Sequence, residues 1–268
     1  MLLQNKNAVI YGGGKSLAGA VARAMAREGA AIYLAGRNVA SLQKVKEDII
    51  RDGGRAEVAE LDGMDEKAIG QHLESVVASA GTLDVSFNLI GVPNVQNITV
   101  TDISLEEFIQ PITGAMTTQF LTTAAAARIM IKQGSGVILS LTATPGGIGY
   151  PLTAGFGVAC AAMEGFSRNL AAELGPHGVR VVNIRSAGSP DSRPFAEALA
   201  SAGDMIKPIL KRMAEDTMLK KLPLMEDIAN TAVYLSSYLA DKVTGITIDV
   251  TVGTITQIKR APTDRVLR

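Results

Sequence analysis

The residue types and spacings that indicate chemistry begin at a glycine-rich turn near the N-terminus. Gly12, Gly13 and Gly14 follow an apolar run, 8–11, that is typical of a buried strand. An apolar helical pattern comes next, and a second apolar run follows at 31–34. Glycines at this place let the backbone turn tightly and let a pyrophosphate reach the amide groups that begin the helix. This order of elements predicts a dinucleotide site, with a generic turn and helix cap as the alternative.

The residues after the second apolar run indicate which dinucleotide is bound. A cofactor without a 2′-phosphate usually meets Asp or Glu there, because the acid accepts hydrogen bonds from the ribose hydroxyls. This chain places Gly36 and then Arg37 at that point. Arg37 can hold a phosphate through two hydrogen bonds, and Lys15 in the glycine turn adds a second cation. We therefore expect NADP(H) as the cofactor, the alternative being that both cations are ordinary solvated charges.

The elements that must position these residues follow from the alternation of short apolar runs with amphipathic stretches. Beyond the first two runs, the expected strands lie at 56–61, 83–89, 137–141, 179–184 and 246–250. Strands separated by helices pair in parallel, and right-handed crossovers place helices on both faces of the sheet. The sequence predicts one α/β domain at 1–258, with a Rossmann-type doubly wound sheet of about seven parallel strands, and a basic C-terminal tail at 259–268.

Three irregular segments each follow the carboxyl end of an expected strand, which is where open α/β sheets bind ligands. They lie at 93–102, 145–153 and 186–195, and an amphipathic segment at 195–213 follows the third. We expect these three loops to form the substrate site.

Composition limits the classes of function. Lys plus Arg and Asp plus Glu number 26 each, so no net charge attracts nucleic acid or an anionic membrane. Aromatic residues make up 4% and tryptophan is absent, which gives little support to a nucleic-acid-binding Rossmann domain. One cysteine and two histidines distant in sequence, His72 and His177, argue against a zinc site. Without a long apolar segment or signal-peptide core, we expect a cytoplasmic protein.

Several segments besides the glycine turn carry a family resemblance. Leu61 and Asp62 follow the third expected strand, Asn-Leu-Ile-Gly at 88–91 follows the fourth, and Leu-Ala-Ala-Glu-Leu-Gly-Pro-His-Gly at 170–178 precedes the sixth. With these segments the chain resembles a short-chain dehydrogenase/reductase over essentially its full length. The family glycines of the turn fall on Gly12, Ser16 and Ala18. The resemblance implies cofactor contacts at Gly12, Gly14, Lys15, Ser16, Leu17, Arg37, Asp62, Gly63, Asn88, Gly91 and Gly188.

The catalytic positions of that family are occupied by unusual residues in this chain. The family commonly uses Asn, Ser, Tyr and Lys, and its lysine lowers the pKa of the tyrosine that transfers the proton. Alignment through 161–165 places Phe156 at the tyrosine and Cys160 at the lysine, and neither side chain can replace those functions. Ala115 falls at the asparagine, while Thr142 falls near the serine and keeps a hydroxyl.

A second resemblance is to the enoyl reductase branch, which reduces carbon–carbon double bonds. It rests on the stretch 141–160 and on Ser-Ala-Gly at 186–188. The tyrosine of that branch lies seven residues before the lysine, which corresponds to Thr153 here. Charge then develops on an enolate oxygen, for which Thr142, Thr153 and Tyr150 are candidate hydrogen-bond donors. The lysine is absent in this alignment too.

Each candidate in the pocket has a structural alternative. Tyr150 is either a substitute acid or a loop anchor whose ring packs against Pro151, and Thr142 is either a donor or the β-branched end of a strand. Cys160 has no cationic neighbour in sequence, so we expect it to pack rather than react. With Phe156 four residues earlier, it is expected to form an apolar wall of the pocket. Arg193, in a segment that forms a lid in the family, is either an anion contact or solvated.

The favoured hypothesis is an NADP(H)-dependent oxidoreductase with a non-standard active site. It transfers hydride to an activated C=C, slightly preferred, or to a C=O of a small or thioester substrate. The alternative is a catalytically inactive NADP(H)-binding pseudoenzyme that serves as a sensor, scaffold or partner subunit. The helical stretches 105–132 and 155–174 carry few charges, so we expect a homo-oligomer, a tetramer or dimer, unless the domain itself covers them.

Overall fold

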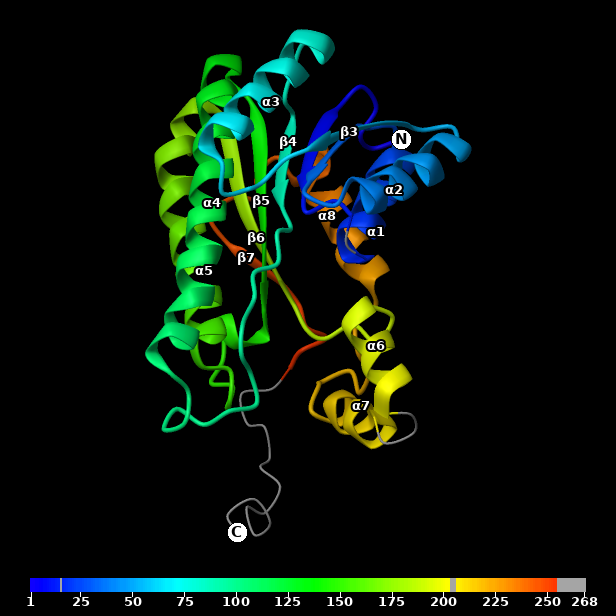
Figure 1. Cartoon of the computed structure of the whole chain (residues 1–268). Coiled ribbons are helices and arrows are strands. Elements are labelled where there is room, and N and C mark those ends of the chain that lie inside the picture. The colour runs from blue at the N-terminus through cyan, green and yellow to red at the C-terminus, as the bar shows by residue number, and fades with distance from the viewer. Residues whose placement is uncertain (15, 203–205, 255–268) are drawn as a thin grey trace.

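The computed structural model describes residues 1–14, 16–202 and 206–254 and is an α/β fold with a single seven-stranded sheet (Figure 1). All six strand pairings are parallel, in the order β3-β2-β1-β4-β5-β6-β7, which confirms the predicted Rossmann-type sheet. The strands are β1 (Asn7–Tyr11), β2 (Ala31–Gly36), β3 (Arg55–Glu60), β4 (Val85–Asn88), β5 (Gly136–Ala143), β6 (Val179–Ser186) and β7 (Thr247–Val250). The helices are α1 (Ser16–Arg27), α2 (Val39–Arg51), α3 (Glu66–Ala80), α4 (Leu105–Gln133), α5 (Ala154–Leu174), α6 (Arg193–Ala202), α7 (Ile206–Glu215) and α8 (Met225–Ser236).

Two hydrophobic cores lie on the two faces of the sheet, because successive side chains of a strand point to opposite faces. Ile10 of β1 packs in the core under α1, α2 and α8, whereas its neighbour Val9 packs in the core under α3, α4 and α5. Figure 1 shows these helix groups on opposite sides of the sheet. A strand buried on both faces reads as a continuous apolar run, which is why β1 is recognisable from sequence.

The order of the strands reverses at the middle of the sheet. From β1 the chain builds outward through β2 and β3, then returns to the other side of β1 with β4 and continues to β7. The crossovers therefore diverge between β1 and β4, and a crevice opens beyond the carboxyl ends of these two strands. The glycine turn leaves β1 at this point.

The expected helices agree with the structure except at the lid. The stretches 105–132 and 155–174 are α4 and α5 to within one residue. The segment 195–213, expected as one amphipathic stretch, contains two helices, α6 and α7, with 203–205 outside the described residues. Both lie beyond the carboxyl end of the sheet (Figure 1), and we call them the lid helices.

Two further expectations concern the C-terminal tail and membrane-spanning segments. The basic tail at 259–268 lies outside the described residues. Within the described ranges, none of the helices combines the length and the apolar composition needed to cross a membrane.

The packing of α5 on α4 generates a stability prediction. A Cβ on Gly155 would lie 1.9 Å from the Phe108 carbonyl oxygen, so Gly155→Ala must push the two helices apart. We expect a loss of about 1–3 kcal/mol in the free energy of unfolding from overpacking, measured by urea denaturation. Gly165→Ala in the same helix is the control, because its nearest neighbouring atom is 4.0 Å away. The control should gain about 0.5–1 kcal/mol from helix propensity, and equal effects at the two sites would contradict the packing argument.

Candidate functional site

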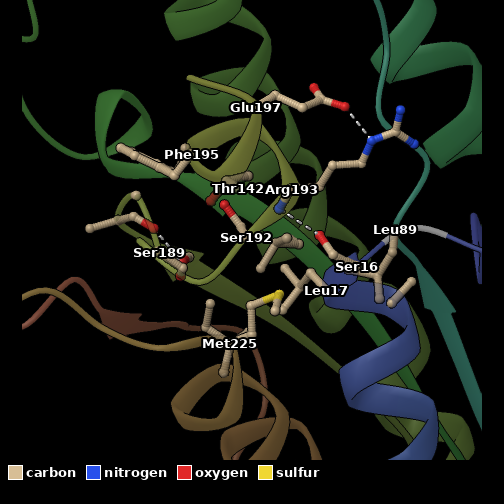
Figure 2. Close-up of a pocket in the computed structure, with 17 residues that line it drawn as sticks. Ser16, Leu17, Leu89, Thr142, Ser189, Ser192, Arg193, Phe195, Glu197 and Met225 are labelled. Carbon is tan, nitrogen blue, oxygen red and sulfur yellow. Dashed lines mark hydrogen bonds and ion pairs between the residues drawn. The ribbon is translucent and has the colours of Figure 1, made fainter. Parts of the chain in front are cut away.

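Two cavities open along the carboxyl edge of the sheet, one on each side of the glycine turn. The lid-side cavity, about 520 Å³, lies between the start of α1, the ends of β5 and β6, and α6 (Figure 2). It is lined by Ser16, Leu17, Ala18, Leu89, Leu141, Thr142, Ala143, Ser186, Ala187, Gly188, Ser189, Ser192, Arg193, Phe195, Glu197, Met225 and Ile228. The β2-side cavity, about 370 Å³, lies beyond the ends of β1, β2, β3 and β4.

The glycine turn is held closely between neighbouring segments. Gly12 has φ +74°, and a Cβ on it would lie 2.6 Å from the Leu89 carbonyl oxygen. A Cβ on Gly14 would lie 2.1 Å from the Ser41 Oγ at the start of α2. Gly12 therefore requires glycine, whereas a side chain at Gly14 would displace the Ser41 hydroxyl. The turn brings Ser16 at the start of α1 to the lid-side cavity. Lys15 lies outside the described residues.

The β2-side cavity collects the residues that follow three strands. Arg37 follows β2, Asp62 and Gly63 follow β3, and Gly91 follows β4. The Asp62 carboxylate accepts a hydrogen bond from the Met64 N–H at 3.0 Å, which fixes it at the cavity wall. These four residues, each expected from the sequence to contact a cofactor, therefore line one cavity.

Asn88, another expected cofactor residue, has a different position. It is buried and lines neither cavity. Its side-chain amide donates to the Thr122 hydroxyl at 3.1 Å, and its Oδ1 accepts from the Ile90 N–H at 2.9 Å. Asn88 therefore ties the end of β4 to α4 and shapes the β2-side cavity through the chain that follows it.

Thr142 lies at the wall of the lid-side cavity, near the end of β5, and is almost fully buried. Its hydroxyl donates to Glu164 Oε1 at 2.8 Å and accepts from Asn183 Nδ2 at 2.7 Å. A hydroxyl has one donor and two acceptor positions. One acceptor position of Thr142 is therefore left after these two bonds.

A partly buried ionic cluster behind Thr142 was missed by the sequence reasoning. Arg185 of β6 donates from Nε to Glu164 Oε1 at 2.9 Å and from Nη2 to Oε2 at 2.5 Å, and from Nη1 to Asp249 at 3.1 Å. Thr142, Arg185 and Asp249 are register partners on β5, β6 and β7, so they share the sheet face that α5 covers. Hydrogen bonding to Glu164 and its charge raise the pKa of Arg185. The available signals were a charged residue, Arg185, near the end of an apolar strand and a second, Glu164, directly after the apolar run 158–163 of α5.

Tyr150 and Thr153 do not line either cavity within the described residues. The Thr153 hydroxyl donates to the Tyr150 carbonyl oxygen at 3.0 Å, so its proton is used within its own loop. Burial, and then the charge of Asp216, raise the pKa of Tyr150. A raised pKa makes the phenol a weaker acid than a solvated tyrosine.

Phe156 and Cys160, expected to form an apolar wall of the pocket, line neither the lid-side nor the β2-side cavity. Cys160 is buried instead under a 3-10 turn at Thr144–Gly146, where a Cβ on Gly146 would lie 3.1 Å from the Cys160 Cβ. Burial raises the pKa of the Cys160 thiol. Cys160 thus has the environment of a packing residue rather than a nucleophile.

The three expected substrate loops differ in their contributions. The segment 186–195 lines the lid-side cavity, and Pro93 of the first loop lines the β2-side cavity. The loop 145–153 lines neither, because it folds against the first loop, where the Asn97 N–H donates to the Leu152 carbonyl at 2.8 Å. In the part of the chain that the structure describes, no group of His, Cys, Asp and Glu side chains is arranged to hold a metal ion.

Comparisons with known proteins give a consistent result. Residues 12–254 match a family model described as enoyl-(acyl carrier protein) reductase. An uncharacterized oxidoreductase of Mycobacterium tuberculosis is 32% identical over 254 residues, 94% of this chain and 92% of that protein. A 3α-hydroxysteroid dehydrogenase of Mediterraneibacter gnavus is 28% identical, over 93% of this chain and 97% of that protein. The solved structure of NAD⁺-bound xylitol dehydrogenase shares the fold, with a TM-score of 0.86 at 23% identity, over 94% of this chain and all of that one.

The ionic cluster generates the second prediction. Glu164→Ala leaves the half-buried Arg185 with one exposed carboxylate partner, so we expect a loss of about 1–3 kcal/mol in the free energy of unfolding. Glu215→Ala is the matched control, because its pair with Lys211 is exposed at 3.9 Å and should cost about 0.5 kcal/mol or less. Urea denaturation at low ionic strength measures both, because a denaturing salt would screen the ion pairs. A loss at Glu164 no larger than that at Glu215 would show that the cluster does not stabilise the fold.

Proposed function

Because this chain belongs to the short-chain dehydrogenase/reductase family, whose members are NAD(P)-dependent oxidoreductases acting on small molecules, we propose an NADP(H)-dependent reductase with a non-standard active site. Hydride goes to an activated C=C or C=O of a small or thioester substrate. The observation that carries the proposal is the pair of cavities that flank the glycine turn where the crossovers diverge. A dinucleotide has two halves joined by a pyrophosphate, and this arrangement provides a cavity for each half.

The fit of the cofactor rests on the lining residues. The adenosine half is assigned to the β2-side cavity, beside Asp62 and Gly63, and the nicotinamide half to the lid-side cavity, beside Leu17 and Gly188. The pyrophosphate lies at the start of α1, where backbone N–H groups and the helix dipole favour an anion. When bound, the cofactor supplies the hydride.

The choice of NADP(H) over NAD(H) rests on the end of β2. Gly36 and Arg37 both line the β2-side cavity there, at the position where an acid would accept from the ribose hydroxyls of NAD(H). The Arg37 guanidinium supplies a positive charge and a fork of donors for a 2′-phosphate.

Thr142 is the proposed catalytic hydroxyl. In the resting site its proton is directed to Glu164, away from the cavity. An oxyanion that develops on the substrate is a stronger acceptor than this carboxylate, so the hydroxyl turns its proton toward the reacting oxygen. Glu164 keeps both of its bonds from Arg185 while this happens, which limits the cost of releasing Thr142. Asn183 holds the Thr142 oxygen in place throughout.

The proposed substrate presents an apolar group to the lid-side cavity. Leu89, Leu141, Phe195 and Ile228 contribute apolar surface to this wall. Hydroxyl-bearing residues line the same cavity, namely Ser16, Thr142, Ser186, Ser189 and Ser192. An unsaturated thioester fits this composition, because its acyl chain is apolar and its carbonyl oxygen needs only a few donors. The similarity to an enoyl-(acyl carrier protein) reductase model supports the same class.

A homo-oligomer, a tetramer or dimer, is proposed from apolar side chains on the outer faces of the two long helices. Phe120 of α4 is 53% exposed and Val158 of α5 is 45% exposed in the single chain. Large apolar side chains on adjacent helices are favourable sites for contact with a second copy.

A catalytically inactive NADP(H)-binding protein is the second candidate, favoured by a specific observation. The Thr142 and Thr153 protons are both used within the protein, and the pKa of Tyr150 is raised rather than lowered. Titration of the pure protein with NADPH and NADH, followed by enoyl thioesters, enones and ketones, separates the two candidates. Oxidation of NADPH by any panel member supports the reductase, and tight binding without oxidation supports the sensor or scaffold.

The third prediction concerns Arg37. Arg37→Glu replaces a donor fork with a like charge opposite the 2′-phosphate, so the Kd for NADPH should rise about 100-fold while that for NADH changes little. Nicotinamide fluorescence measures both constants. Arg128→Glu on α4 is the control, because Arg128 lines neither cavity and should leave both constants unchanged. Equal weakening of the two cofactors by Arg37→Glu would remove the basis for the NADP(H) assignment.

The fourth prediction concerns Thr142. Thr142→Val keeps the shape of the side chain but removes its hydroxyl, so kcat should fall about 10²–10³-fold while the Kd for NADPH stays unchanged. Thr142→Ser should keep most of the activity, because it restores the donor. Stopped-flow measurement of NADPH oxidation distinguishes these variants. Full turnover by Thr142→Val would exclude Thr142 from the chemistry.

A further inference from the structure

Arg193, the first residue of α6, is the single residue of the described chain that lines both cavities. A ligand that occupies both cavities must therefore pass beside Arg193. Its backbone N–H donates to the Ser16 Oγ at 3.2 Å, a bond that connects residues 177 positions apart. The start of the lid is thus in contact with the start of α1, beside the glycine turn.

The charge at this crossing point is positive. Among the described residues that line the two cavities, the cations are Arg37, at the end of β2, and Arg193. Arg193 Nε donates to Glu197 Oε1 at 2.5 Å, one helical turn along α6. Figure 2 shows the Arg193 side chain pointing away from Ser16, with its guanidinium on the side of Leu89 and joined to Glu197 by the ion pair.

The ion pair with Glu197 uses only part of the hydrogen-bonding capacity of the Arg193 guanidinium. A guanidinium has five N–H groups, and the contact with Glu197 uses the one at Nε. The N–H groups of the two terminal nitrogens can therefore donate to an anion. The side chain is 76% exposed, so it can adjust to a ligand without displacing packed neighbours.

We propose that Arg193 binds the pyrophosphate of the dinucleotide from the lid side. The inference rests on the proposed cofactor site and adds a residue to it. The glycine turn and the N-terminus of α1 hold the pyrophosphate from one side. Arg193 lies beside Ser16 at the point where the two cavities meet, so its guanidinium reaches the same phosphates from the lid side.

The pyrophosphate is common to NADPH, NADH and ADP-ribose, which separates this contact from one at the 2′-phosphate. Arg193→Gln should raise the Kd for all three by about tenfold, as expected for loss of one charge-assisted contact. Arg193→Lys should give a smaller rise, because it keeps the charge and loses the planar fork. Calorimetry measures all three constants in the intact protein, and the cofactor-free Arg193 variants should melt at the wild-type temperature.

Lys211→Gln is the matched control, because Lys211 forms the same kind of i,i+4 pair with Glu215 on the neighbouring helix and lines neither cavity. It removes the same charge and should leave all three constants unchanged. An independent readout is hydrogen exchange of α6 amides, which NADPH should slow in the wild-type protein and not in Arg193→Gln.

The possible results are distinct. Unchanged constants in Arg193→Gln, weakening of NADPH alone, or weakening that spares ADP-ribose would each overturn the assignment of Arg193 to the pyrophosphate. Equal weakening by Lys211→Gln would attribute the effect to net charge and would also overturn it. Failure of the wild-type protein to bind either nicotinamide dinucleotide would instead count against the proposed cofactor.

Discussion

The site depends on one constraint of the fold, the change of direction of the crossovers between β1 and β4. Right-handed crossovers that diverge on the two sides of this point leave the carboxyl ends of the two strands uncovered, so a crevice opens there. The glycine turn, the ends of β1, β2, β3 and β4 and the start of α1 meet at this crevice, and the ends of β5 and β6 continue it toward the lid. The proposed cofactor residues lie along it, and Arg193 adds a contact from the lid helix α6.

The parts of the fold and site that could be predicted from sequence are those set by local periodicity. Buried parallel strands read as apolar runs, and each run fixes where its strand ends, so the sequence alone places Arg37, Asp62, Gly91 and Gly188 at the ends of strands, where the cavities lie. Asn88 lies at the end of β4, but its side-chain amide bonds to Thr122 of α4, because a buried amide needs hydrogen-bond partners within the protein.

The rest of the site could not be predicted because it depends on contacts between distant segments. Glu164 and Arg185 are 21 residues apart, and only the packing of α5 across β5 and β6 brings their charges together. The same packing removes Cys160 from the cavity, since the turn at Thr144–Gly146 lies against it. Sequence spacing placed Phe156 and Cys160 on one helix face but carried no information about what covers that face.

The ionic cluster also bears on which reaction suits the site. Arg185 carries one positive charge and contacts two carboxylates, so the charge behind Thr142 is on balance negative. A localised alkoxide beside Thr142 would be repelled by it, whereas the family's usual lysine would attract an alkoxide. An enolate spreads its charge over a thioester and takes its final proton at carbon, so it places less charge next to Glu164. For the proposed reductase, this charge is more favourable for reduction of an activated double bond than for reduction of an isolated ketone, with Thr142 as the proposed donor to the enolate oxygen.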